Sequence, residues 1–298
     1  MEDVKALFIF CEGPHDVAFC RLIFKYCFNI KTVKWKFSKY PSPLSQIFKQ
    51  NMKNHAAQDM SLDMAHKFFL PDKTLADEKE NQIVLLFNSG GKTKPENPKL
   101  FLANYLSLID EAGTLPDDID NIEKVINDTK YLFIYDADHE AAPTVFQNCK
   151  NSFSHIEDTH FIKENFIPLS ENHLFVITEN KAVYIWRNSD TKKGTLEDIL
   201  IPLFSSHSKE KLDNAEKYVD ESFEWEINHD QEIMKYASIA KRNKAIISSA
   251  GQGRKPGRPM SAMIDDNIFA AKKDFQENKS VQDFADFICN FAGLEKIT

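Results

Sequence analysis

The chain has 298 residues, of which 42% are hydrophobic and 28% are charged, so it can form a packed core and is not a disordered or fibrous chain. It carries 45 acidic residues against 37 Lys and Arg, which gives a formal net charge of −8. This balance argues against a protein that coats nucleic acid through its overall charge, because phosphate binding needs concentrated positive charge. An enzyme that holds a metal ion in a carboxylate cluster is compatible with it.

The five cysteines are odd in number and include no CxxC pair. A disulfide framework or a structural zinc site is therefore not expected. No apolar stretch reaches membrane-spanning length, and the apolar run near the N-terminus is too short for a signal-peptide core. We expect a soluble, cytoplasmic protein without a membrane partner.

Apolar runs in the first two thirds of the chain predict buried strands. In chain order they span 4–11, 82–87, 130–135 and a less regular pair, 174–177 and 182–186. Near-continuous apolar runs of this length are typical of strands buried on both faces of a parallel sheet. Helical patterns separate the runs, over 15–28, 99–111 and 142–153. This alternation predicts an α/β fold, a parallel sheet flanked by helices.

Two regions depart from that scheme. Residues 31–81 are polar and contain three prolines, and we expect a mostly helical insertion there. Helical patterns dominate after residue 194, over 196–204, 230–248, 260–271 and 281–291, with a basic loop rich in Gly and Pro at 251–259. The chain therefore divides into a core at 1–193 and a helical C-terminal region at 194–298, which carries the basic loop as a mobile arm.

Acidic residues stand where two of the predicted strands end. Glu12 closes the first strand, and Asp16 lies in the first turn of the helix that follows. Asp136 and Asp138 close the third, and their spacing points both side chains the same way if the strand continues that far. The carboxyl ends of parallel strands meet at one edge of a sheet, so these four acids can meet there. Such a cluster needs a divalent cation, and all-oxygen ligation favours Mg²⁺ or Mn²⁺.

The residues at these strand ends also carry a resemblance. A buried strand, then Glu-Gly-Pro-His-Asp from Glu12, then a helix, and later Asp-Ala-Asp from Asp136, resembles the Toprim domain of topoisomerases, bacterial primases, recombination mediators and a group of nucleases. The spacing of Glu12 and Asp16 is similar to the nuclease branch, with its overcoming-lysogenization-defect family and small stand-alone antiphage effectors. The resemblance covers about half the chain. It implies a Rossmann-like Toprim sheet and metal-dependent cleavage of phosphodiester bonds in DNA or RNA.

The same resemblance implies further site residues. In those nucleases a small hydroxyl residue and a Glu, spaced like Thr195 and Glu197, complete a second metal position. A lysine further along the chain is often used too, and Lys241 and Lys244 are the candidates here. The chain would hold two ions, one on Asp136 and Asp138 with Glu12, the other near Asp16 and Glu197. Glu12 would act as a ligand or as general acid/base.

The resemblance also implies a biological context. Small Toprim nucleases without an ATPase domain resemble effectors of antiphage or abortive-infection systems that a separate ATPase or sensor protein controls. We expect this chain to lack the ATPase domain of the larger relatives. Its 24 Phe residues follow core periods and also permit a homodimer.

Basic residues supply a predicted surface for the nucleic acid substrate. Eight Lys and Arg fall between 241 and 273, and another lysine follows the second strand. The alternative for such a run is an ordinary solvated face, and residues 88–93 resemble a P-loop only superficially, because Pro95 opposes the helix that should follow. The candidates for phosphate contacts are Lys92, Arg242, Arg254, Lys255 and Arg258.

Other interpretations stay open. Asp136 and Asp138 are also compatible with a solvated turn, a sugar-nucleotide transferase motif or a phosphatase nucleophile, although His139 is unusual for the last. Thr195 can be read as a helix cap with Glu197 in the first turn. For the whole chain, the alternatives are a catalytically silent Toprim scaffold and a primase-type nucleotidyl transferase. The four acids argue against the first because an unused cluster repels itself, and no cysteine cluster supports the zinc module of the second.

Overall fold

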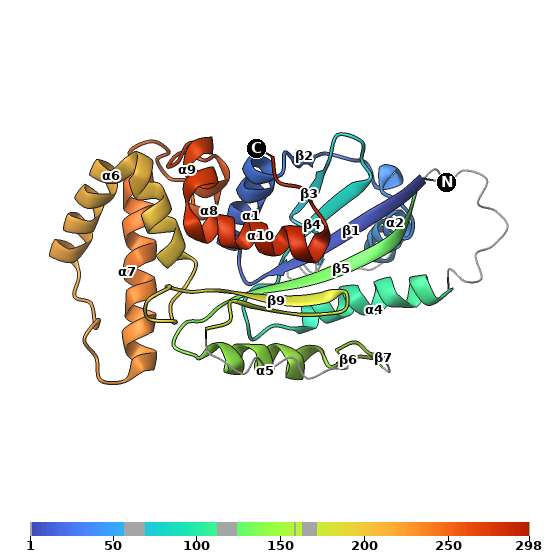
Figure 1. The fold of residues 1–298 in the computed structure, drawn as a ribbon, viewed down its shortest axis with the longest axis horizontal. Coiled ribbons are helices and arrows are strands. Elements are labelled where there is room, and N and C mark those ends of the chain that lie inside the picture. Colours follow the sequence, from blue (N-terminus) through green and yellow to red (C-terminus); the bar gives the residue numbers. More distant parts are fainter. Residues whose placement is uncertain (1, 57–68, 112–123, 158, 163–171, 298) are drawn as a thin grey trace.

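The computed structural model describes residues 2–56, 69–111, 124–157, 159–162 and 172–297 (Figure 1). Its centre is a seven-stranded sheet in the order β2-β3-β4-β1-β5-β9-β8. The four inner strands run parallel, and the strands are β4 (Gln82–Asn88), β1 (Glu2–Cys11), β5 (Lys124–Asp136) and β9 (Lys181–Trp186). The prediction of an α/β fold with a mostly parallel sheet is confirmed.

Three shorter strands at the sheet edges run antiparallel to their neighbours. They are β2 (Lys31–Val33) and β3 (Lys73–Ala76) on one side and β8 (Phe175–Thr178) on the other. A small separate hairpin joins β6 (His155–Ile156) to β7 (Thr159–His160). The parallel strands thus occupy the middle of the sheet, where both of their faces are covered.

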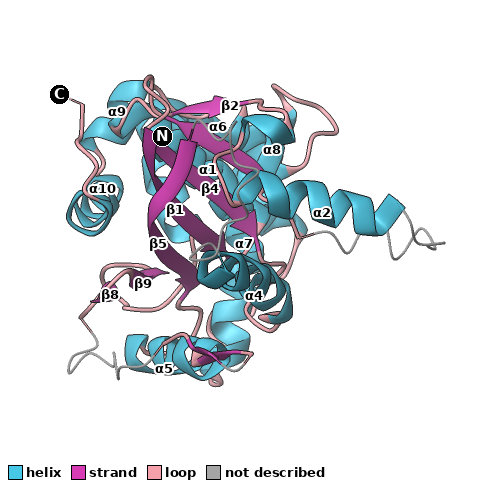
Figure 2. Ribbon diagram, turned by 90° about the vertical axis from the view of Figure 1, so that its right-hand side faces the viewer, coloured by secondary structure: helices cyan, strands magenta, loops and turns pink. Residues whose placement is uncertain are grey.

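Alternating side chains of β1 divide the core into two layers. Leu7 and Ile9 lie in one apolar cluster, whereas Phe8 and Phe10 lie in the other. Helices cover both faces of the sheet, as Figure 2 shows for α10 and α4. The first layer contains α1 (Pro14–Cys27), α8 (Met260–Asp265), α9 (Lys272–Glu277) and α10 (Lys279–Ala292). The second contains α2 (Leu44–Ala56), α4 (Glu96–Glu111) and α5 (Ala142–Phe153).

In its described residues, 31–56 and 69–81, the predicted insertion is less helical than the sequence analysis predicted. It contains α2 and the short 3₁₀ helix η1 (Phe37–Lys39), but β2 and β3 add two strands to the sheet. Both strands are short and carry polar residues, Lys-Thr-Val and Lys-Thr-Leu-Ala, so they lack the long apolar run that reveals a central strand. Residues 57–68 lie outside the described residues.

The C-terminal region begins with two long helices beyond the carboxyl ends of the parallel strands (Figure 1). They are α6 (Glu197–Ser222) and α7 (Glu232–Gln252). The predicted helix at 196–204 continues through Pro202 and bends at Ser208, whose φ of −128° is not helical. Beyond the bend, Leu212, Ala215 and Val219 repeat at helical spacing and are buried, which explains why the helix extends so far.

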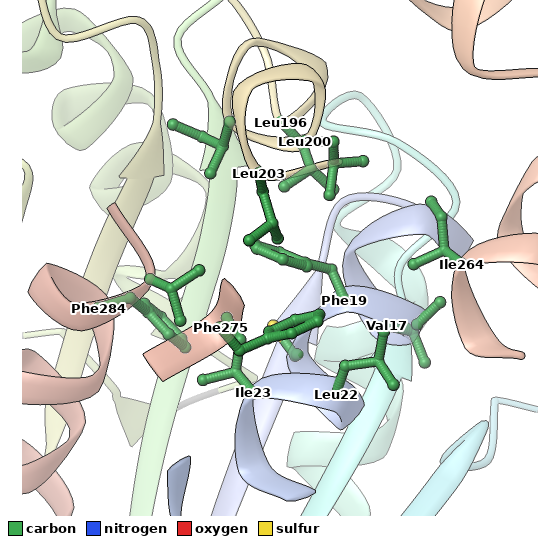
Figure 3. Close-up of a cluster of buried hydrophobic side chains, with 14 of the residues drawn as sticks. Val17, Phe19, Leu22, Ile23, Leu196, Leu200, Leu203, Ile264, Phe275 and Phe284 are labelled. Atoms are coloured by element: carbon green, nitrogen blue, oxygen red, sulfur yellow. The ribbon is translucent and has the colours of Figure 1, made fainter. Parts of the chain in front are cut away.

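The beginning of α6 is anchored on α1 by apolar contacts. Figure 3 shows Leu196, Leu200 and Leu203 in one cluster with Phe19 of α1. Leu200, Leu203 and Phe19 are completely buried. This packing fixes the first turn of α6 against the first turn of α1, which matters for the acids that those turns carry.

The predicted helix at 260–271 is two short helices, α8 and α9. The chain turns between them at Asn267, which has a left-handed φ of 51° that a helix interior does not accept. Among the described residues, no helix is both long and apolar enough to cross a membrane. All five cysteines are free thiols in the structure.

Candidate catalytic cleft

A cleft of about 350 Å³ opens at the carboxyl ends of the parallel strands. Its walls come from the ends of β1, β4 and β5 and from the first turns of α1 and α6, with α7 on the outer side. Four of the predicted acids line it, and they are Glu12, Asp16, Asp136 and Glu197. The sheet therefore brings together carboxylates that are far apart in the sequence.

Glu12 and Asp136 are neighbours because β1 and β5 pair in parallel register. The Glu12 Oε2 atom accepts a hydrogen bond of 3.2 Å from the backbone N–H of Asp136. Asp136 Oδ1 accepts one of 2.8 Å from the N–H of Leu196. Burial, reinforced by the charges of the neighbouring acids, raises the pKa of Asp136 well above its ordinary value. Burial also raises the pKa of Glu12, although the charge of Lys92 opposes it.

Asp16 has one carboxylate oxygen without a partner. Its Oδ2 accepts a hydrogen bond of 2.9 Å from the N–H of Gly13, and its Oδ1 is buried with no hydrogen-bond partner among the described residues. Burial, followed by the charges of Glu12 and Glu197, raises the pKa of Asp16 to about 8. A buried carboxylate oxygen in this position needs a proton or a cation, because an unpaired buried charge is strongly unfavourable.

Glu197 has the opposite electrostatic environment. Its Oε2 accepts a hydrogen bond of 2.7 Å from the hydroxyl of Thr195. Its Oε1 lies 3.4 Å from His15 Nδ1 and 3.9 Å from Lys244 Nζ. Burial favours a higher pKa for Glu197, but the hydrogen bond from His15 and the charge of Lys244 outweigh it and the pKa is lowered. Glu197 is therefore the acid of the cleft that ionises most readily.

The turn before α6 has a different cap from the one that the sequence suggested. Leu196, not Thr195, is the N-cap residue. The Thr195 N–H donates a 2.8 Å hydrogen bond to Asp198 Oδ2, and Asn243 of α7 donates one of 3.3 Å to the other oxygen of Asp198. The Thr195 hydroxyl is thus free of the capping role and is directed at Glu197.

Asp138 does not share the cleft with Asp136. β5 ends at Asp136, and Asp138 lies beyond it with a left-handed φ of 51°. The strand therefore does not continue to Asp138, as the predicted parallel orientation of the two side chains required. Its Oδ2 lies 2.5 Å from Lys92 Nζ, and Glu140 lies 3.8 Å from the same ammonium group. Burial favours a lower pKa for Lys92, but the charges of Glu12 and Asp138 outweigh it and the pKa is raised.

The structure separates the two candidate lysines of α7. Lys244 lines the cleft beside Glu197. Lys241 is exposed and is not among the described residues that line the cleft. Lys244 is therefore the candidate that the geometry favours.

The predicted phosphate-binding residues of the C-terminal region lie away from the cleft. Arg242 forms ion pairs of 2.6 Å with Glu216 and Asp220 of α6. Lys255 and Arg258 lie 3.5 and 3.6 Å from Asp266, and Arg254 donates to the carbonyl of Ile268. The basic loop is therefore held against α8 and the turn after it rather than extended as an arm beside the acids.

Sequence reasoning missed His15 as part of the site. His15 is the second residue of α1, between Glu12 and Asp16 in the chain, and its ring contacts Glu197. The sequence signal that could have identified His15 is its position between Glu12 and Asp16. The sequence also gave no sign that Lys92 would pair with Asp138, because this contact depends on how two loops pack.

The donor set of the cleft fits a hard divalent cation, although its side chains are not yet arranged around one. Within the described ranges, no three His, Cys, Asp or Glu side chains have the spacing of a complete metal site. Backbone N–H groups hold Glu12, Asp16 and Asp136 in separate hydrogen bonds. The donors are all oxygens and the Asp16 Oδ1 atom is unpartnered, which suits Mg²⁺ or Mn²⁺ after small side-chain movements.

Comparisons with known proteins assign no function. No family model matches the chain, and no curated protein matches it. Among solved structures, a hypothetical protein from Pyrococcus horikoshii OT3 aligns with a TM-score of 0.41 and 14% identity over 98% of this chain and 96% of that one. Function therefore has to be argued from the cleft.

Proposed function

We propose that this protein is a metal-dependent nuclease of the Toprim type that hydrolyses phosphodiester bonds in DNA or RNA. The observation that supports it is the cleft itself, in which Glu12, Asp16 and Asp136 stand at the carboxyl edge of a parallel sheet with one unpartnered carboxylate oxygen. The resemblance of the two acidic motifs to Toprim nucleases supplies the reaction. Retained acids at this position also argue against a silent scaffold, because their mutual repulsion destabilises a protein that does not use them.

The acids of the cleft would hold Mg²⁺ or Mn²⁺. Glu12 and Asp136 would bind one ion, and Asp16 and Glu197 a second, with Thr195 directing the Glu197 carboxylate through its hydroxyl. A bound pair of such ions activates water and stabilises charge on the attacking and leaving oxygens. Glu12, whose pKa is raised, is also the residue suited to exchange a proton with water or with the leaving group.

Two lysines would act on the phosphate. Lys244 stands at the open side of the cleft and would offset the charge that develops on the scissile phosphate in the transition state. Lys92 is held by Asp138 in the described structure. Asp138 could bind a metal ion only after its ion pair with Lys92 breaks. Breaking this ion pair would also free the Lys92 ammonium group for a substrate phosphate.

The proposed context is antiphage defence in the cytoplasm, under the control of a separate ATPase or sensor protein. Only the resemblance to small Toprim effectors supports this context. Comparing the cleavage rate of the purified chain with that of the chain in cell extract tests it. Full activity of the isolated protein would contradict control by a partner.

Cleavage assays test the proposed reaction directly. Plasmid, linear duplex, single-stranded DNA and total tRNA are each incubated with the protein in Mg²⁺, Mn²⁺ or EDTA, alongside Glu12→Ala and Asp136→Ala. We expect cleavage of at least one substrate that requires metal and is lost in both variants.

The two lysines of α7 provide a matched control for the same assay. Lys244→Ala should lower kcat by roughly 10²-fold or more, the range for loss of one group that stabilises transition-state charge. Lys241→Ala removes the same charge from the same helix outside the cleft and should leave kcat unchanged. No cleavage of any substrate, together with a melting temperature that does not respond to metal, would reject the nuclease and favour the silent scaffold.

A further inference from the structure

A second cavity lies between α6 and α7, away from the catalytic cleft. It has a volume of about 620 Å³ and is formed by the part of α6 beyond the bend at Ser208 and by the C-terminal end of α7 with the residues that follow it. We call it the α6–α7 pocket. It shares no residue with the cleft, and its size is in the range of small-molecule sites.

The pocket exists because small residues face one another across the two helices. Ala215 of α6 and Ala250 of α7 form part of its wall, and Gly253 follows at the end of α7. A Cβ atom built on Gly253 would meet no atom within 4 Å. Leu212 and Ile246, both buried in the apolar core, hold the helices together. The hollow is thus a defined feature of the packed helix pair.

Two cations at the pocket have no acidic partner within the described part of the chain. Among the described residues, Lys211 forms no ion pair, and Arg254 donates only to the carbonyl of Ile268, which orients its guanidinium group. The neighbouring basic residues Lys255 and Arg258 are paired with Asp266 instead. In a chain of net charge −8, two unpaired cations on one cavity mark a place for an external anion.

The remaining lining residues add an aromatic face and free polar groups. The Tyr218 side chain is 59% exposed and, within the described part of the chain, stacks on no other ring. Asn214 and Ser249 make no side-chain hydrogen bond to any other described residue, so both can bind a ligand. Gln252, by contrast, is occupied by Gly257 and Arg258.

We propose that the α6–α7 pocket binds a nucleoside phosphate, with the base on Tyr218 and the phosphate on Lys211 and Arg254. Cations alone would suit any anion, but the exposed Tyr218 ring in the same lining also favours a ligand with a flat face that can stack on it. Asn214 and Ser249 are placed for the base edge or the sugar. The ligand is either a free nucleotide or one unit of a nucleic acid strand, because both present this chemistry. The proposal does not rest on the nuclease function, since the pocket shares no residue with the cleft.

Calorimetric titration tests the proposal in the Glu12→Ala full-length protein, which prevents cleavage of the ligand. The probes are AMP, ATP, GTP, inorganic phosphate and a short single-stranded oligonucleotide. We expect binding of a nucleotide probe that is weakened about tenfold or more in Lys211→Ala, in Arg254→Ala and in Tyr218→Ala. Tyr218→Phe keeps the ring and should retain binding, and Lys209→Ala, exposed on α6 but outside the lining, is the matched control.

A variant whose side chain fills the pocket provides an independent test of the proposal. Gly253 has right-handed backbone angles, φ −64° and ψ −22°, so Gly253→Leu introduces no backbone strain and should abolish binding while the protein stays folded. Binding of mononucleotides would assign the pocket to a free nucleotide, and binding of the oligonucleotide alone would assign it to a strand. The proposal is overturned if no nucleotide probe binds, if Gly253→Leu binds as well as its parent, or if inorganic phosphate binds equally and Tyr218→Ala has no effect.

Discussion

Two carboxylates of the cleft show how neighbouring acids acquire opposite proton affinities. Among the described residues, one buried oxygen of Asp16 has no hydrogen-bond partner and no cation lies within ion-pair distance of this side chain, whereas Glu197 is contacted by His15 and Lys244. Burial favours the protonated form of both. The contacts of Glu197 with His15 and Lys244 outweigh burial, whereas the hydrogen bond from the Gly13 N–H to Asp16 does not. Asp16 is therefore expected to change its protonation within the pH range of a stability measurement, and an added cation would favour its charged form.

The free energy of unfolding of the metal-free protein should decrease as pH rises from about 4 to about 8. The unfolded chain loses the Asp16 proton near its ordinary pKa of 3.8, whereas the folded protein keeps it until about pH 8. The folded state thus binds more protons across this window, and stability falls with rising pH. Melting temperatures at the two ends of the window check the sign, and Mg²⁺ should raise the melting temperature more at the upper end.

Asp16→Asn serves as the matched variant for this prediction. It removes the unfavourable charge, so the metal-free variant should melt higher than wild type at about pH 8 and should lose the response to Mg²⁺. Asp213→Asn, at an exposed site on α6, should melt like wild type with an unchanged response. A lower melting temperature for Asp16→Asn at this pH would contradict the assignment of Asp16 as an uncompensated acid.

The positions of residues at strand ends could be predicted from the sequence, whereas the positions of residues in loops could not. Glu12 and Asp136 stand directly after long apolar runs, so the topology of a parallel sheet was enough to bring them together. Asp138 lies two residues further, where a left-handed turn replaces the strand, and its pairing with Lys92 depends on the backbone of two loops. His15 and the unpartnered oxygen of Asp16 likewise require the packing of α6 on α1.

Among the elements, the turn at Gly194 joins the sheet to the helical region. Its N–H and carbonyl exchange hydrogen bonds of 2.6 and 2.7 Å with Asp138, and its φ of +107° is a conformation that favours glycine. A Cβ atom here would stand 2.2 Å from Asp198 Oδ2, the oxygen that accepts the Thr195 N–H. The entry of α6 into the cleft therefore depends on this glycine.

Gly194→Ala should lower the free energy of unfolding by about 2–3 kcal/mol, because it combines backbone strain with the clash against Asp198. Urea unfolding followed by circular dichroism measures the loss. Gly257→Ala is the control, since Gly257 also has a positive φ of 72° but has open space around its Cβ position, and only about 1–2 kcal/mol is expected there. Equal losses at the two positions would show that the contact with Asp198 has no effect.

Element prediction from the sequence succeeded where burial is continuous. The central strands carry near-continuous apolar runs, and α5 spans the predicted residues 142–153. The edge strands β2 and β3 are too short and polar to give such a signal. α6 extends beyond the predicted end at residue 204 because Leu212, Ala215 and Val219 continue the apolar pattern past the bend at Ser208 and are buried.

For the molecule as a whole, the last helix completes the core on the α1 face. Phe284 of α10 lies 4.9 Å from the ring of Trp186 and 4.8 Å from that of Tyr184, both on β9. Phe284 is completely buried, and α10 also ends in a left-handed Gly293 that stops the helix. The C-terminal helix is thus part of the same core as the strands that bear the acids.

Phe284→Ala should lower the free energy of unfolding by about 3–5 kcal/mol, the usual range for a large cavity in a core. Phe175→Ala is the comparison, because Phe175 also contacts α10 through Phe287 but is 38% exposed, so its loss should be clearly smaller. Chemical denaturation of the two variants checks the difference. A loss at Phe284 no larger than at Phe175 would show that α10 does not complete the core.

The residues of the cleft are widely spaced along the chain, from Glu12 at one end to Lys244 near the other, and this spacing sets an order of assembly during translation. Ribosomes release a chain from its N-terminus, so Glu12 appears first and α7 long afterwards, and α10, which completes the core, later still. A growing copy therefore carries the acids without the lysine opposite them and without the helices that hold them in place. Under the proposed function, an unfinished nuclease would be harmless to the RNA from which it is being made.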